Sequence, residues 1–296
     1  MKIDLHQHSH YSYDSIASID DIFQRASQDG IQVVGLTDHD NVDGVFKFRK
    51  MSKKFEEIIS IGGIEIKTKF KDNDIHILGY GLNIESSLLK NYIGTCKNTD
   101  KINFNEWVTI MNELGYRLNR DDIYIWYQQR FSTNFIPENP PQWLRYHFLK
   151  EYLNLPSLAD AKLISRRARR IQRYIRRPDI SNAIRALRHS NAVIFLAHAG
   201  KLFERNEDVF NELMTYDFDG IEVFHPENST SQINKLLMIS NAQNMLVSAG
   251  SDYHGNMYPF EHDEFILDCP NEQAKSLLDV LLEAEIRATE QNIYEG

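Results

Sequence analysis

Short apolar runs alternate with amphipathic stretches along the first and last thirds of the 296-residue chain. Runs of this kind, bounded by polar and turn residues, predict buried strands. The predicted strands are residues 3–5, 33–37, 61–66, 75–82, 192–198, 220–225 and 245–252. Helical periodicity predicts helices between them, the first two over residues 18–29 and 45–59. This alternation predicts a parallel sheet with right-handed crossovers, and its repetition favours a closed β/α barrel of about seven strand units.

The first predicted helix has recognisable ends. Ser18 is a good N-cap, and Asp21 follows three residues later, where its side chain completes a capping box. Gly30 then ends the helix, because glycine readily adopts the left-handed conformation at that point.

The middle of the chain, residues 86–189, breaks the alternation with helix-like and aromatic segments interrupted by prolines. We predict a helical insertion subdomain here, with the barrel formed by residues 1–85 and 190–296. Between Lys162 and Arg177 the insertion holds eight basic residues and no acid. These arginines recur at three-to-four spacing and predict one charged helix stripe, which either binds a polyanion or is a solvated face.

Composition narrows the class of protein. The net charge of −9 argues against non-specific affinity of the whole chain for nucleic acid or membranes, but not against a local basic site. Cys96 and Cys269 are the only cysteines, so no disulfide framework or thiolate zinc site is expected. No run is apolar enough to span a bilayer, and Met1 leads directly into a strand, so we expect a cytoplasmic protein.

Histidines and carboxylates follow the predicted strands. In a β/α barrel the carboxyl ends of the strands meet at one rim, where active sites form. His6 and His8 are two apart and therefore point the same way from an extended segment. The full set of candidate metal ligands is His6, His8, Asp14, His39, Glu65, His76, His198, Asp252 and His254.

A single histidine at a strand end is usually a structural residue, but a ring of them with carboxylates needs another explanation. Clustered without a cation, these groups would suffer desolvation and repulsion among the carboxylates. Nitrogen and oxygen donors without thiolate suit Zn, Mn or Fe. Nine donors exceed what one or two ions require, whereas three ions fit if Glu65 bridges two of them.

The motifs, in order, strongly resemble those of the polymerase and histidinol phosphatase (PHP) family. They are HxH at the start, then LTDHDNVDG, GGIEI, IHILGYG, LAHAGK and GSDYH. The resemblance covers about residues 1–85 and 190–296. It implies a metal-dependent phosphoesterase on a distorted (β/α)7 TIM-like barrel. Within the family, the chain resembles most the stand-alone members with a helical insertion that remove phosphate from nucleotides.

The resemblance also implies how three divalent ions (Mn, Fe or Zn) are shared. The first would bind His6, His8, Glu65 and Asp252, the second Glu65, His76 and His198, and the third Asp14, His39 and His254. A hydroxide bridging the ions would attack phosphorus. Asp38 and His225 stand beside ligand positions and are candidates to protonate the leaving group, Asp38 alternatively to orient a ligand histidine.

Substrate contacts are expected from Lys201, Arg177 and Arg173. Two departures from the family pattern bear on them. Lys201 stands in HAGK where the family has arginine, which removes bidentate phosphate binding. Arg177 opens RPDIS where the family has RPHIA, so the histidine is replaced by Asp179.

The favoured hypothesis is hydrolysis of a phosphomonoester on a nucleotide or a short RNA or DNA, with no obligate protein partner. Histidinol phosphatase or another small-molecule phosphatase is the alternative within the same class. A metal-dependent amidohydrolase also begins with HxH on a barrel strand, but Asp14, His76 and the terminal SDxH favour phosphoesters. A non-catalytic metal-binding accessory domain is the remaining reading.

Overall fold

The structure, a computed structural model, describes residues 1–131, 140–255 and 269–294. The chain forms two compact units. We call Met1–Ile93 together with Pro178–Gly296 the barrel unit, and Gly94–Arg177 the helical unit. The bounds of 86–189 drawn from the sequence for the insertion stay a prediction. None of the helices in the described part of the chain is long and apolar enough to cross a membrane.

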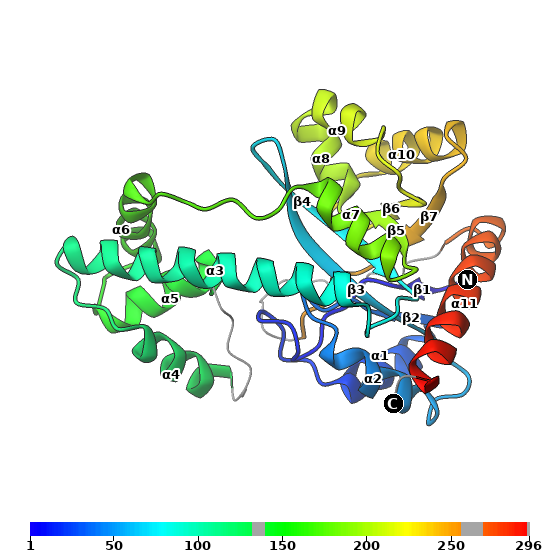
Figure 1. The fold of residues 1–296 in the computed structure, drawn as a ribbon, viewed down its shortest axis with the longest axis horizontal. Helices are drawn as coiled ribbons and strands as arrows, with labels where there is room; N and C mark the ends of the chain where they lie inside the picture. Colours follow the sequence, from blue (N-terminus) through cyan, green and yellow to red (C-terminus); the bar gives the residue numbers. More distant parts are fainter. Residues whose placement is uncertain (132–139, 256–268, 295–296) are drawn as a thin grey trace. The chain divides into compact units, whose positions relative to one another are not determined.

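Seven strands follow one another in sequence order around the barrel unit and form a nearly closed barrel (Figure 1). The ends of the first and last strands and the residues that follow them are joined by hydrogen bonds from Leu5 N to Ala249 O (2.9 Å) and from Asp252 N to His6 O (2.8 Å). The predicted α/β barrel is therefore confirmed. The strands are β1 (Ile3–Asp4), β2 (Val33–Leu36), β3 (Ile59–Phe70), β4 (Asn73–Tyr80), β5 (Val193–Leu196), β6 (Gly220–Phe224) and β7 (Leu246–Ala249).

The prediction that all strands run parallel is wrong for β4, which is antiparallel to both β3 and β5. Phe70 pairs with Asn73, so only Lys71 and Asp72 connect β3 to β4. A two-residue connection makes a hairpin, whereas a parallel pair needs a long crossover. Because β4 runs backwards, it carries His76 in its amino-terminal half toward the rim where the other strands end.

Helices connect the remaining strands. The capping box predicted for α1 is present, with Ser18 accepting from Asp21 N and the Asp21 side chain accepting from Ser18 N. Gly30 ends α1 with a left-handed φ of 67°. The barrel-unit helices are α1 (Ile19–Asp29), α2 (Asp43–Ser52), α7 (Ile180–His189), α8 (Ala199–Arg205), α9 (Glu207–Leu213), α10 (Thr230–Ala242) and α11 (Asn271–Tyr294), and α3 (Ser87–Glu113) begins here.

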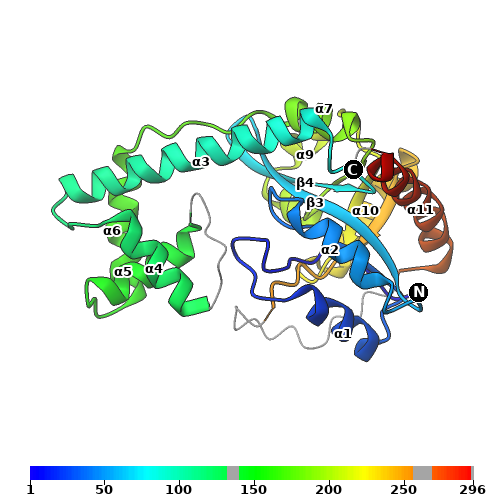
Figure 2. The same cartoon turned by 60° about the horizontal axis from the view of Figure 1, so that its bottom comes forward.

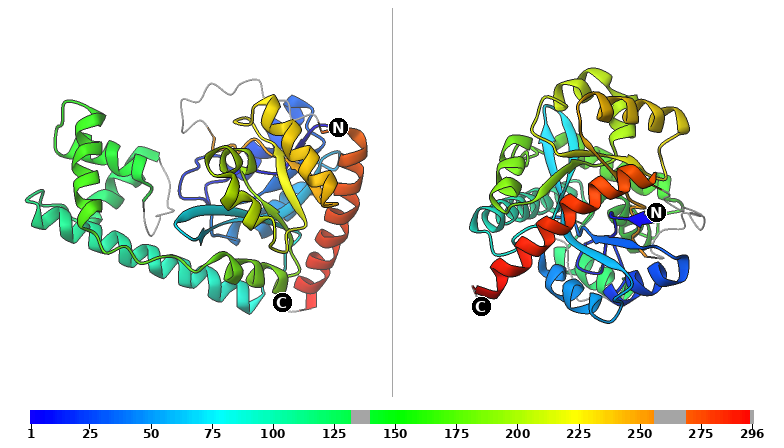
Figure 3. Two further views of the ribbon diagram at one scale, coloured as in Figure 1. Left: turned by 90° about the horizontal axis from the view of Figure 1, so that it is seen from above. Right: turned by 90° about the vertical axis from the view of Figure 1, so that its right-hand side faces the viewer.

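The last helix closes the end of the barrel where the parallel strands begin (Figure 3). Leu277 and Leu281 of α11 belong to one buried cluster with Leu5, which follows β1, and with Tyr80 and Phe195 of β4 and β5. An ion pair anchors this helix. Arg49 of α2 donates from Nε to Glu285 Oε1 of α11 (2.6 Å) and from Nη2 to Oε2 (3.0 Å). The same Oε2 accepts from Gly62 N on β3 (3.2 Å).

The helical unit has a hydrophobic core of its own around Phe104, Trp107 and Phe148. It holds most of α3 together with α4 (Arg120–Phe131), α5 (Gln142–Tyr152) and α6 (Leu158–Ile171) (Figure 2). The predicted helix stripe over Lys162–Arg177 is wrong beyond Ile171. Gln172 has an extended ψ of 130°, and Asn103 of α3 binds both backbone groups of Ile175, so this segment leaves the helix.

Candidate metal centre

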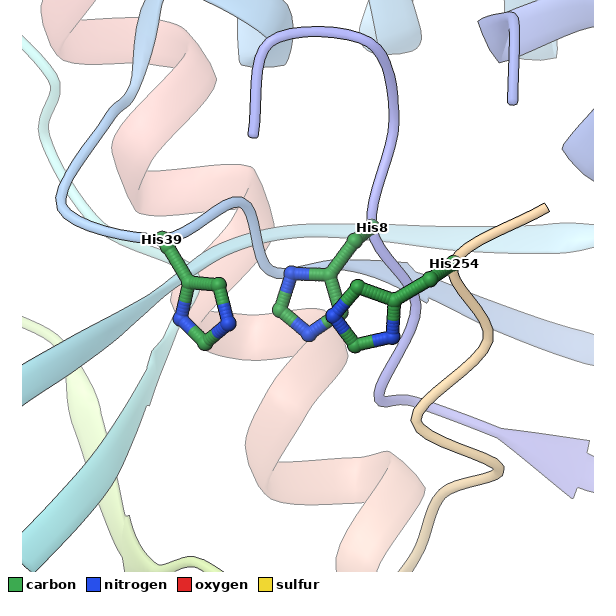
Figure 4. A group of neighbouring side chains, drawn as sticks. All are labelled: His8, His39 and His254. Carbon is green, nitrogen blue, oxygen red and sulfur yellow. The ribbon is translucent and has the colours of Figure 1, made fainter. Parts of the chain in front are cut away.

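Imidazoles and carboxylates from six strands or the segments that follow them converge at one rim of the barrel. His8 follows β1, His39 follows β2 and His254 follows β7, yet their rings lie side by side (Figure 4). The His8 ring stacks on both neighbours, with centroids 4.3 Å from His39 and 4.2 Å from His254. All three side chains point into one shared space, although 246 residues of chain separate the first from the last.

Four of the predicted ligands form the first set. His6 Nε2 lies 3.1 Å from Glu65 Oε2 and 3.4 Å from Asp252 Oδ1. His8 Nε2 lies 3.3 Å from the same Glu65 oxygen and 3.1 Å from the same Asp252 oxygen. Two imidazole nitrogens and two carboxylate oxygens therefore face one another across a single small space.

The other oxygen of Glu65 belongs to a second set. Glu65 Oε1 lies 2.7 Å from His76 Nδ1 on β4 and 3.5 Å from His198 Nε2, which follows β5. Glu65 is fully buried, and its two oxygens face different groups of imidazoles. This orientation is the one that a carboxylate bridging two ions would adopt.

Asp14, His39 and His254 form the third set. Asp14 Oδ2 lies 3.4 Å from His39 Nε2, and Asp14 Oδ1 lies 3.6 Å from His254 Nε2. The other ring nitrogen of His39 lies 3.0 Å from Glu65 Oε2, so this ring connects the third set to the first two. Tyr13 stacks on the His39 ring with centroids 5.1 Å apart.

Hydrogen bonds at Nδ1 fix which nitrogen of several imidazoles faces this space. Glu222 Oε1 accepts from His6 Nδ1 (2.8 Å), and the Asp252 carbonyl accepts from His254 Nδ1 (2.7 Å). His8 Nδ1 pairs with Ser12 Oγ (3.1 Å). A proton held on Nδ1 leaves a lone pair on Nε2, which is the form of histidine that binds metals.

Glu222 is a functional candidate that sequence reasoning missed. It is fully buried on β6, and its second oxygen accepts from His198 N (2.8 Å), so one carboxylate holds the segments that follow β1 and β5. A signal was present in the sequence: in GIEVFH, an acidic residue interrupts an apolar strand. Such a residue is expensive to bury without a partner.

The donor atoms fit divalent ions. Two ligands that each lie about 2.1 Å from one ion are about 3.0–3.4 Å apart at octahedral or tetrahedral angles. The separations within the three sets cluster around these values, and tight groups of potential ligands recur across the rim. Several of the buried donor atoms lack a hydrogen-bond partner among the described residues: His6 Nε2, Asp14 Oδ1, His39 Nδ1, Glu65 Oε2 and His198 Nε2. Coordination would satisfy them.

The buried carboxylates and imidazoles of the cluster shift one another's pKa values. Burial opposes ionisation of Glu65, yet His39, His6 and His76 outweigh it and hold the Glu65 pKa well below its usual range. Burial likewise opposes protonation of His6, but the facing carboxylates raise the His6 pKa well above normal. His198 differs, because burial dominates and lowers its pKa to about 3. Without ions, protonation of His6 is therefore favoured and protonation of His198 is opposed.

Asp38 faces a serine rather than the ligand sets. Its Oδ1 accepts from Ser9 N (2.6 Å) and its Oδ2 from Ser9 Oγ (2.9 Å). Burial raises the pKa of Asp38 to about 7. Asp4 binds Ser251 in the same two-point way, through N (2.8 Å) and Oγ (2.7 Å). We call each of these two-point contacts a clamp. The clamp from Asp38 to Ser9 joins the segments after β2 and β1, and the clamp from Asp4 to Ser251 joins β1 to the segment after β7.

His225 is buried behind the cluster. Its Nδ1 accepts a hydrogen bond from Glu227 N (3.2 Å), so its proton lies on Nε2, which is 4.0 Å from Asp252 Oδ2. No described residue accepts a hydrogen bond from this Nε2. His225 Nε2–H is therefore available as a hydrogen-bond donor.

The three basic residues predicted to contact substrate lie in different settings. Lys201 is exposed on α8 and forms an ion pair with Glu227. Arg177 is buried and pairs with Asp100 of α3 inside the helical unit. Arg173 is exposed in the extended segment after α6.

Close packing at the closure of the barrel depends on one glycine. A Cβ on Gly250, directly after β7, would lie 2.1 Å from His6 Cβ and 2.6 Å from Glu222 Oε1. Any side chain here would displace both His6 and the carboxylate that orients it. Glycine is therefore required for the first ligand set to form.

Comparison with known proteins agrees with this geometry. The model of the PHP domain family matches residues 4–155, and the chain belongs to this family. It is 23% identical over 272 residues to phosphoribosyl 1,2-cyclic phosphate 1,2-diphosphodiesterase of Eggerthella lenta, covering 88% of this chain and 97% of that protein. It is 20% identical over 261 residues to 3',5'-nucleoside bisphosphate phosphatase of Chromobacterium violaceum, covering 85% and 87%.

A solved structure described as a metal-dependent phosphoesterase, from Bifidobacterium adolescentis, has the same fold. It superposes with a TM-score of 0.73 at 20% identity, over 94% of this chain and 96% of that one. Family membership and the ligand clusters together identify the chain as a metal-dependent phosphoesterase, an enzyme that hydrolyses phosphoric esters.

Proposed function

We propose that the chain hydrolyses a phosphomonoester of a nucleotide or short oligonucleotide at a centre of three divalent ions. The observation that carries this proposal is the convergence of nine donor residues at one rim of the barrel, with Glu65 facing two groups of imidazoles through different oxygens. Assigning these donors to three ions follows the sharing of ligands that the family resemblance implies. Bound Mn, Fe or Zn would supply an activated water and neutralise the phosphoryl oxygens.

The protein's own groups prepare this centre. Glu222 keeps the His6 proton on Nδ1, and the Asp252 carbonyl does the same for His254, so that both Nε2 atoms face inward. The clamps from Asp4 to Ser251 and from Asp38 to Ser9 fix the backbone on either side. We assign Asp38 to positioning, because both of its oxygens are engaged by Ser9.

His225 is assigned a different role from that of a general acid. Its Nδ1 accepts the Glu227 N–H, so protonation of the ring would cost that hydrogen bond. A neutral imidazole is a very weak acid but a good hydrogen-bond donor. We therefore assign His225 Nε2–H to a phosphoryl or leaving-group oxygen of the substrate, where it would stabilise developing charge.

The substrate class is supported by the bisphosphate phosphatase relative, which spans nearly the same length of chain. The test is turnover by the Mn-loaded chain of a panel of phosphate esters: 3',5'-bisphosphate nucleotides, AMP, short RNA, histidinol phosphate and p-nitrophenyl phosphate. The proposal expects the highest kcat/KM for a nucleotide. Preference for histidinol phosphate would reject the nucleotide substrate.

A cyclic phosphodiester is the second candidate substrate. The relative from Eggerthella lenta acts, by its name, on a phosphoribosyl 1,2-cyclic phosphate, and the alignment covers 97% of it. A ribose 1,2-cyclic phosphate therefore belongs in the same panel. Ring opening without turnover of any monoester would favour this candidate over the first.

A further inference from the structure

The two units carry opposite charge. Residues 94–177 contain 15 Lys and Arg against 8 Asp and Glu, a net charge of +7. The other 18 Lys and Arg and 34 Asp and Glu give the rest of the chain −16. The overall charge of −9 therefore conceals a strongly basic unit. A charge difference of this size between parts of one chain is typical of a protein that binds a polyanion.

The positive charge is concentrated on one helix and the segment that follows it. We define the basic face as Arg166, Arg167, Arg169, Arg170 and Arg173. All five are exposed, whereas Ala161, Ser165 and Ala168 turn inward from the same helix. The core of the helical unit therefore holds α6 with its arginines directed to solvent.

Among the described residues, none of the five guanidinium groups takes part in an ion pair. Arg177, four residues beyond Arg173, shows the contrast, because it is buried against Asp100. A solvated face whose role is only solubility usually mixes both signs, whereas this one holds a single sign.

A further arginine strengthens the positive field. Arg145 of α5 is buried, with its guanidinium 5.0 Å from the Trp107 ring centroid. Burial and the neighbouring charge of Arg169 lower the pKa of Arg145 to about 10. The positive charge of Arg169 is therefore close enough to Arg145 for the two groups to repel each other.

We propose that the basic face of the helical unit binds the phosphodiester backbone of single-stranded nucleic acid. Arginine presents a planar fork that matches phosphate oxygens, and positions three and four apart on a helix are neighbours about 5–6 Å apart, so successive phosphates can be bound together. Tyr174, which is 45% exposed directly after Arg173, offers a ring on which a base can stack. This inference deepens the proposed function by naming a strand of nucleotides as substrate, and in that respect rests on it.

The test measures binding by the full chain in EDTA, so that no ester is hydrolysed. The probe is a fluorescein-labelled 20-nucleotide single-stranded RNA, followed by fluorescence anisotropy from 50 to 300 mM salt. One variant combines Arg166→Gln, Arg167→Gln, Arg169→Gln and Arg170→Gln, all on exposed positions of α6. The matched control combines Lys47→Gln, Lys50→Gln, Lys53→Gln and Lys54→Gln, which removes the same charge from exposed positions of the barrel unit. Circular dichroism and thermal unfolding check that both variants fold.

We expect the arginine variant to weaken RNA binding at least about tenfold at 50 mM salt and to reduce the salt slope by about 2–3, since each phosphate contact contributes about 0.7 for a single strand. The lysine control should change the Kd less than about twofold. Equal weakening in both variants, or no binding by the unaltered chain, would overturn the proposal. So would a dimer by light scattering that only the arginine variant dissociates, because the acidic surface of a second copy would then be the partner.

The RNA-binding test and the test of the proposed function can fail independently, because one measures binding in EDTA and the other measures turnover with Mn. Turnover of a 3',5'-bisphosphate nucleotide by the Mn-loaded arginine variant should match the unaltered chain within about twofold. Loss of RNA binding with normal nucleotide turnover supports both proposals. RNA binding that depends on the arginines, in a chain that hydrolyses no nucleotide, leaves the basic face in place and rejects only the proposed function.

Discussion

Glu222 Oε1 accepts a hydrogen bond from His6 Nδ1 at 2.8 Å, and the opposite nitrogen of the same ring lies 3.1 Å from Glu65 Oε2. A buried imidazole is thus held between two buried carboxylates with a different function on each side. Glu222 fixes the tautomer, and the Nε2 lone pair is left for an ion shared with Glu65. The buried pair of Glu222 and His6 therefore orients the His6 ring as a ligand at the rim of the barrel.

Removing that orienting carboxylate should weaken metal binding. We expect Glu222→Ala to raise the metal dissociation constant about 10–100-fold, because the His6 ring loses the partner that fixes its tautomer. Glu222→Gln keeps an acceptor oxygen and should recover part of the loss. Competition with a fluorescent chelator measures the affinity, with exposed Glu212→Ala as the control. Unchanged affinity in Glu222→Ala would show that the carboxylate is only structural.

Residues of the first ligand set should be essential for catalysis. His8→Ala and Asp252→Ala each remove a donor atom that lies 3.1 Å from the other, so we expect kcat with p-nitrophenyl phosphate to fall by at least about 100-fold. His189→Ala, at an exposed histidine of α7, is the control and should retain normal turnover. Near-normal turnover in either ligand variant would remove that residue from the site.

Metal binding should release protons. The carboxylates overcome burial to raise the pKa of His6, His39 and His254 in the metal-free chain, which favours protonation of these rings. A metal ligand must be deprotonated, so affinity should fall as the pH falls. Calorimetry at pH 7 in two buffers of different ionisation enthalpy should report more than one proton released per chain. Heats that are independent of the buffer would contradict the proposed ligands.

The ion pair between Arg49 and Glu285 should make a large contribution to stability. Both side chains are only 12% exposed, and removal of one partner leaves a buried charge, which costs about 3–5 kcal/mol. We expect Arg49→Ala to lower the free energy of unfolding in urea by that amount. The control is Arg287→Ala, because the exposed Arg287 lies 4.0 Å from Glu283 and such pairs contribute about 0–1 kcal/mol. Equal effects would mean that α11 is held by its apolar contacts alone.

Much of the fold is readable from local patterns. Ser18, Asp21 and Gly30 define α1 because capping depends on neighbouring residues alone. The direction of β4 is not readable in that way. Its apolar run fits either direction, and the short turn at Lys71 and Asp72 decides it.

Part of the site can likewise be predicted from local sequence patterns, and part depends on contacts between distant residues. Histidines at strand ends stand out because polar residues interrupt apolar runs, as at His6 and His198. The role of Glu222 depends on a partner 216 residues away, and that distance is set by barrel closure rather than by any local pattern. The end of α6 was missed for the same reason, since Asn103 of another helix holds the backbone of Ile175.

The most direct test of the three-ion centre is an anomalous difference map from crystals of the Mn-loaded chain. The account predicts three separate peaks: one among His6, His8, Glu65 and Asp252, one among Glu65, His76 and His198, and one among Asp14, His39 and His254. A map without peaks at these side chains, or with the donor atoms turned away from every peak, would contradict it.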